Sequence, residues 1–160
     1  MTQIQEVRNK LIGSWSLISS RTELYDSPDV EPNVLYTIGK DANGIIMFSP
    51  DGYVSTQLMR PGAIKWESNN LLDGTAEELA DATRHSLAYA GTFDVEARGD
   101  ETLIYINVDL CSFPNWLGDR QERVVRLEGE VLKLTPPSFI MQGKKAQPIF
   151  EWKKMDDRND

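Results

Sequence analysis

The segment Thr102 to Cys111 carries the side chains with the clearest chemical potential. Alternation along a strand divides this segment into two opposite faces. The aliphatic face comprises Ile104, Ile106, Val108 and Leu110. The polar face comprises Tyr105, Asn107, Asp109 and Cys111. A carboxyl group buried in an apolar pocket has a raised pKa and can serve as a general acid or base. Asp109 is therefore the first catalytic candidate.

Two orientations of this strand fit its pattern. In the first, the aliphatic face fills the core and the polar face meets water, as in an ordinary half-buried strand. In the second, the aliphatic side chains pack outward and the polar face lines a pocket. Tyr105 and Asn107 would then orient a carbonyl or hydroxyl of a bound molecule while Asp109 moves its proton. The residue pattern alone favours the first orientation. Acid–base catalysis by Asp109 requires the second.

Arg123 is the candidate that would act with this polar face. It shares one side of the following strand with Gln121 and Val125. A buried guanidinium needs an acidic partner, and Asp109 is the nearest one expected. Arg123 would bind an anionic or enolic oxygen of a ligand, or it would have a structural role by stacking on Trp15. The catalytic candidates are thus Asp109, Arg123 and Asn107.

Aromatic and amide side chains from separate segments give the expected pocket its character. Four Trp and five Tyr are enough to line a cavity for a rigid, mostly apolar ligand. The candidate ligand-binding residues are Tyr53, Gln57, Trp66, Tyr89, Tyr105, Cys111, Trp116 and Gln121. We expect a cavity of at least ~300 Å³. Its expected lining is Tyr53, Gln57, Tyr89, Asn107, Asp109 and Arg123.

Other catalytic classes find little support in the sequence. One His and one Cys do not supply a zinc site of the usual type. Phosphate-binding glycine loops and the nucleophile-elbow motif do not occur. We therefore expect no metal and no nucleotide cofactor. His85 falls away from the apolar side of its predicted helix, four residues after Asp81, so we expect it in solvent.

Length and charge narrow the class of protein. The chain has 160 residues and a formal net charge of −8. This suits one domain spanning residues 1–160. The acidic balance argues against binding to nucleic acid or to anionic membranes. The N-terminus lacks a signal-peptide pattern, so we expect a cytoplasmic protein. The oligomeric state cannot be inferred from the sequence.

The elements that must position these residues are mainly strands. We expect eight of them, over residues 13–19, 45–48, 53–59, 91–97, 102–111, 122–127, 131–135 and 149–153. Capping boxes at Thr2 and Thr75 predict a short N-terminal helix and an inserted helix that covers one end of the sheet. Residues 22–43 are predicted to be a long loop with one short strand. The pattern is that of an antiparallel meander or barrel.

Several motifs, in the same order along nearly the whole chain, resemble the small lipocalin-like domain family. They are Gly13-Ser14-Trp15, Phe48 to Tyr53, Leu87 to Phe93, Phe113 to Gly118, and Gln121-Glu122-Arg123. The resemblance implies a closed eight-stranded antiparallel barrel around a ligand cavity. It also adds weight to the inward orientation of the polar face. The chain has Asn107 where the family pattern usually has a His, which puts any mechanism using that base in doubt.

The resemblance also sets the expected function. Some relatives stand beside natural-product biosynthetic enzymes, and lipocalin-type barrels have been recruited as cyclases and isomerases. The first hypothesis is a cofactor-independent enzyme that cyclises, isomerises or dehydrates a small hydrophobic metabolite. The alternative is a non-catalytic carrier for such a metabolite. A carrier needs few polar groups in the cavity, whereas an enzyme needs an acid–base residue beside the reacting atom.

Overall fold

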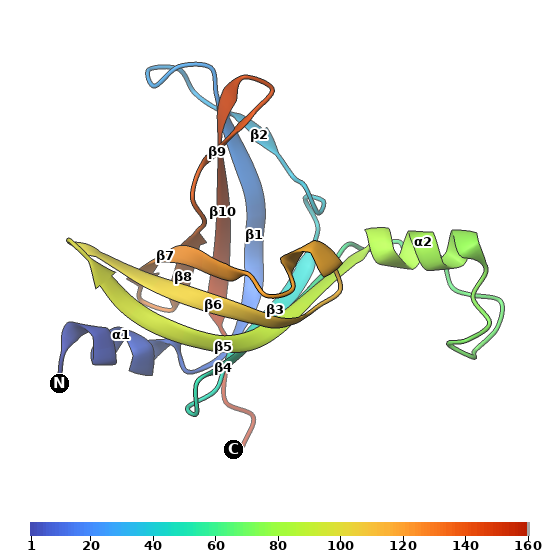
Figure 1. The fold of residues 1–160 in the computed structure, drawn as a ribbon, viewed down its shortest axis with the longest axis horizontal. Coiled ribbons are helices and arrows are strands. Elements are labelled where there is room, and N and C mark those ends of the chain that lie inside the picture. The colour runs from blue at the N-terminus through green and yellow to red at the C-terminus, as the bar shows by residue number, and fades with distance from the viewer. Residues whose placement is uncertain (160) are drawn as a thin grey trace.

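The structure, a computed structural model, describes residues 1–159. Eight strands form the predicted closed antiparallel barrel, and pairing of the first with the last completes the ring (Figure 1). Around the wall they are β1 (Gly13–Tyr25), β3 (Asn43–Phe48), β4 (Tyr53–Met59), β5 (Ser86–Arg98), β6 (Glu101–Cys111), β7 (Arg120–Glu128), β8 (Val131–Thr135) and β10 (Lys144–Lys154). Two short strands, β2 (Asn33–Leu35) and β9 (Phe139–Met141), pair with β1 and β10. Closure leaves the wall strands without free edges along these ladders.

Three wall strands are much longer than the sequence predicts. β1 continues to Tyr25, β5 already begins at Ser86, and β10 begins at Lys144. β1 and β10 pair with each other from Trp15 and Lys154 to the far ends of both strands. This long ladder draws polar residues into strand conformation, which local composition could not indicate.

Helix α1 (Gln3–Leu11) closes one end of the barrel. Its predicted capping box at Thr2 is present, and Leu11 is completely buried. The Trp15 indole Nε1 donates to the Leu11 carbonyl at 2.8 Å. The Lys154 ammonium lies 4.6 Å from the Trp15 ring centroid and donates to the carbonyl of Ile12. Burial lowers the pKa of Lys154.

A β-bulge changes the alternation of β6 near its end. Gly91 pairs with Val108, while the preceding Ala90 pairs with Leu110, so Asp109 is the extra residue. The two backbones approach so closely that a Cβ at Gly91 would lie 1.7 Å from the Asn107 carbonyl oxygen. Only glycine fits there. The bulge reverses which face the residues beyond it occupy.

Helix α2 (Ala76–Arg84) is present as predicted, with its capping box at Thr75. The expectation that it covers an end of the sheet is wrong, because none of its residues is buried and it projects away from the barrel (Figure 1). Its carboxylates instead hold the loop before it: Asp81 accepts from the Ile64 amide and Glu78 from the Glu67 amide. We call residues 60–85 the arm.

Neither this helix nor α1 has the length and apolar character needed to cross a membrane.

Candidate ligand-binding site

The inner face of β6 is aliphatic. Ile104, Ile106 and Val108 are at most 1% exposed and belong to the core, whereas Asp109 is exposed. The first orientation of the strand is therefore the one observed, and the expectation that Asn107 and Asp109 line the interior is wrong. Asn107 donates instead to Thr92 Oγ1 at 3.0 Å and to a carboxylate oxygen of β5. β6 therefore contributes an aliphatic lining to the barrel interior.

Four further candidates also lie outside the barrel interior. Tyr53 and Gln57 are exposed on the outer face of β4, because the buried residues of that strand alternate with them. Tyr105 lies on the outer face of β6 with the Arg120 guanidinium 3.8 Å from its ring. Trp66 belongs to the arm, where Gly74 leaves room for its ring. The expected six-residue cavity does not form, since its members lie on opposite faces of the wall.

Three candidates do meet, at the end of the barrel opposite α1. Tyr89 and Cys111 are directly paired across β5 and β6, and both pack on the core. The bulge at Asp109 turns Cys111 to this inner side. Trp116, in the short helix η1 (Pro114–Trp116), meets Tyr89 edge-on with ring centroids 5.9 Å apart. We call Tyr89, Cys111 and Trp116 the end cluster.

Arg123 and Gln121 lie on the inner side of β7, as their shared spacing with buried Val125 predicts. The Arg123 guanidinium donates to Gln121 Oε1 and to the Glu122 carbonyl, both at 2.8 Å. Both proposed partners of Arg123 are wrong. Asp109 lies on the other side of the wall, and a different cation, that of Lys154, covers Trp15. Arg123 therefore keeps unused N–H donors on the inner side.

Two fully buried polar atoms inside the barrel have no hydrogen-bond partner among the described residues. They are the Thr56 hydroxyl on β4 and the Trp152 indole Nε1 on β10. Both side chains are at most 1% exposed. An unsatisfied buried polar group costs about 1–3 kcal/mol, so each demands an explanation. A ligand that supplies the missing partners is one. Neither residue was predicted from the sequence as a site residue, although Thr56 stands between the inward-facing Val54 and Leu58.

The ionisable side chains that point into the barrel determine whether the interior can carry out acid–base catalysis. Alternation from the buried core residues shows which side chains of the eight wall strands point inward. Within residues 1–159 this inward set includes Arg123 and Lys154 but no Asp, Glu or His. The interior thus offers hydrogen-bond donors and lacks a carboxylate or imidazole base.

His85, the one histidine, ends α2 and is less exposed than predicted. Its side chain is 16% exposed, and Nδ1 lies 2.7 Å from the Asp81 carbonyl and 3.5 Å from the Asp81 carboxylate. The pairing four residues apart is as expected. The low exposure of the ring is a difference that the helical periodicity could not show.

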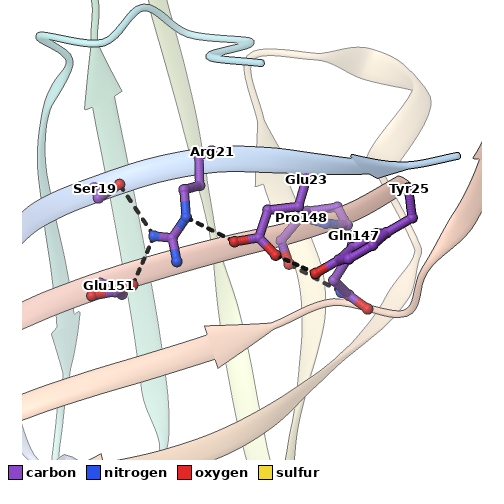
Figure 2. Close-up of polar contacts among 7 residues, drawn as sticks. All are labelled: Ser19, Arg21, Glu23, Tyr25, Gln147, Pro148 and Glu151. Atoms are coloured by element: carbon purple, nitrogen blue, oxygen red, sulfur yellow. Dashed lines mark hydrogen bonds and ion pairs between the residues drawn. The ribbon is translucent and has the colours of Figure 1, made fainter. Parts of the chain in front are cut away.

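A polar network on β1 and β10 was also missed (Figure 2). Arg21 bridges Glu151 at 2.7 Å and Glu23 at 3.3 Å, and the Tyr25 hydroxyl donates to Glu23 at 2.6 Å. That hydrogen bond raises the pKa of Tyr25. These side chains alternate with the buried Ser20, Thr22 and Leu24, which places them on the outer face. The network satisfies itself and reinforces the β1–β10 closure.

The family model for the lipocalin-like domain matches residues 12–155. The chain belongs to this family. It is also 40% identical, over 107 residues, to a 4'-hydroxy-3'-methoxypropiophenone carrier protein of Aspergillus oryzae. That match covers 64% of this chain and 96% of the relative. No solved structure matches.

Proposed function

We propose that this protein is a carrier in natural-product biosynthesis that holds a small aromatic metabolite inside its barrel. Membership of the lipocalin-like family supports small-molecule binding. The relative named for carrying a hydroxy-methoxy propiophenone supports an aromatic ketone as the class of ligand. An eight-stranded barrel is of the size that holds one small ligand.

The observation that carries this proposal is the pair of unpartnered buried atoms. The indole N–H of Trp152 is a donor only, so its partner must be an acceptor. The hydroxyl of Thr56 can donate or accept. A ketone, phenol or methoxy oxygen meets the requirement at Trp152, whereas an ammonium group does not. The inward guanidinium of Arg123 adds a further donor for an oxygen-rich ligand.

Access is expected at the end cluster, since α1 closes the other end. Tyr89 and Trp116 present aromatic surfaces there that suit an aromatic ring. The Thr56 hydroxyl and the Trp152 N–H are sealed from solvent, so the ligand must part the side chains around them. Each new hydrogen bond contributes about 0.5–1.5 kcal/mol net, which offsets part of that rearrangement.

The composition of the inner wall favours a carrier over the cyclase or isomerase hypothesis. That hypothesis gave Asp109 the proton-transfer role, and Asp109 faces outward. No other inward carboxylate or imidazole of residues 1–159 takes its place. A carrier needs only shape and a few hydrogen bonds.

The test is calorimetric titration with 4'-hydroxy-3'-methoxypropiophenone. Wild-type protein is expected to bind one equivalent. Trp152→Phe keeps the aromatic ring but removes the donor, and should weaken binding several-fold. Trp66→Phe, the same change in the arm, is the matched control and should leave the affinity unchanged. Equal affinities for both variants would refute the interior site.

A second measurement separates carrier from enzyme. The compound is incubated with the protein and analysed by chromatography. A carrier returns it chemically unchanged at every time point. Time-dependent conversion that scales with protein concentration would contradict the carrier function.

A further inference from the structure

The outer face of β3–β6 has a character that the carrier function does not use. Two adjoining grooves of about 530 and 520 Å³ cross it. Each is lined by twelve residues and Met47 belongs to both, which makes 23 residues, of which only Asp109 is charged. Charged residues form 26% of the chain, so the lining of these two grooves is strongly depleted of charge. Such depletion marks the core of protein interfaces.

This face carries both large and small side chains, so that it has ridges and troughs. Met47, Ser55, Ala90 and Leu110 form one row of directly paired residues across four strands. The large side chains of Met47 and Leu110 are 42% and 69% exposed, and Tyr53 beside them is 56% exposed. Ser55 and Ala90 form a low floor between them. Large exposed apolar side chains that gather on one face in this way are typical of an interaction site.

We propose that a second copy of this chain covers this face, with a two-fold axis passing close to Met47. In a two-fold interface each patch meets itself. A charged patch would meet its own sign, whereas a neutral patch is complementary to itself. The chain carries a net charge of −8, so an uncharged face is where two copies can approach with least repulsion.

The shape of the two grooves is compatible with a second copy of the chain. A stable interface uses roughly 20–30 residues from each partner, so the exposed lining of the two grooves would form the centre of the contact and its rim would supply the rest. Sheets pack face to face at about 10 Å, with side chains of one interdigitating with those of the other. The ridge at Met47 and Leu110 would enter the partner's trough at Ser55 and Ala90.

The experiment is sedimentation velocity on the full chain from low to high micromolar concentration. The wild type is expected to be a dimer. Met47→Glu introduces a carboxylate beside its own copy and should weaken the dimer by about 100-fold or more. Ile140→Glu is the matched control, since Ile140 is 72% exposed on β9 away from this face, and should remain dimeric. Circular dichroism verifies that the variants are folded.

A charge-pair rescue tests the two-fold axis itself. Met47→Lys alone should also be monomeric, whereas an equimolar mixture of Met47→Lys and Met47→Glu should form heterodimers. A monomeric wild type overturns the proposal, including the case in which the face binds a different protein. A Met47→Glu variant as dimeric as the Ile140→Glu control, or a mixture that stays monomeric, also overturns it.

Discussion

Replacing Thr56 with valine is expected to stabilise the protein and weaken its hold on the ligand. Thr56 is completely buried, and its hydroxyl has no partner among the described residues. Valine keeps the shape and removes the unsatisfied group. An unpaired buried hydroxyl costs about 1–3 kcal/mol, so the free energy of unfolding should rise within that range. For a chain of this size, each kcal/mol raises Tm by about 2–4 °C.

The same change removes one hydrogen bond to the ligand. A net contribution of about 0.5–1.5 kcal/mol corresponds to about a 2- to 10-fold increase in Kd. Thermal unfolding followed by circular dichroism gives the first quantity, and calorimetric titration with the propiophenone gives the second. Stability and affinity are thus expected to move in opposite directions.

Thr92→Val on the outer face of β5 is the control. The Thr92 hydroxyl accepts a hydrogen bond from Asn107 at 3.0 Å, so its loss should lower Tm and leave the affinity unchanged. A lower Tm for Thr56→Val would show that its hydroxyl is satisfied within the protein. A higher Tm with unchanged affinity would show that the ligand binds elsewhere.

Four other expectations concern single sites. Gly91→Ala should cost about 3 kcal/mol or more in urea unfolding, because the new methyl group meets a backbone oxygen; an unchanged midpoint would contradict the bulge geometry. The lowered pKa of Lys154 means that the unfolded chain binds more protons between that pKa and 10.5. Wild-type stability relative to Lys154→Met should therefore rise with pH across that window and be flat below it, in denaturant melts at successive pH values. Glu23→Gln should lower the pKa of Tyr25 toward 10.0 in ultraviolet titration, and an unaltered phenol titration would argue against their hydrogen bond. Asp109→Asn should change stability by less than about 0.5 kcal/mol and leave propiophenone binding intact in calorimetry, since the side chain is exposed.

The fold was predictable because strand alternation and turn residues act locally. The presence of all eight wall strands, both capping boxes and the shared side of Gln121, Arg123 and Val125 follow from local residue types and their spacing. The aliphatic side of β6 was also evident in the pattern of Ile104 and Ile106. The family resemblance added weight to the opposite orientation, which proved wrong.

The features that the sequence did not predict depend on contacts between segments that are distant in the chain. The bulge that turns Cys111 inward exists because Gly91, on another strand, permits a close backbone approach. The missing partners of Thr56 and Trp152 become visible only when the whole interior is assembled. The position of α2 depends on carboxylate contacts to its own loop, and helical periodicity does not report which surface a helix packs against.

The pairing of β1 with β10 has a consequence for folding during synthesis of the chain. The residues that close the ring, such as Trp15 and Lys154, lie at opposite ends of the sequence. At synthesis rates of about 5–20 residues per second, β1 leaves the ribosome on the order of 10 s before β10 exists. Throughout that interval β1 lacks this neighbour, and β8 lacks it from the moment β8 is made, so each exposes a strand edge that can pair with other chains. A nascent chain cut short before β10 should therefore aggregate, and only the completed polypeptide can enclose a ligand.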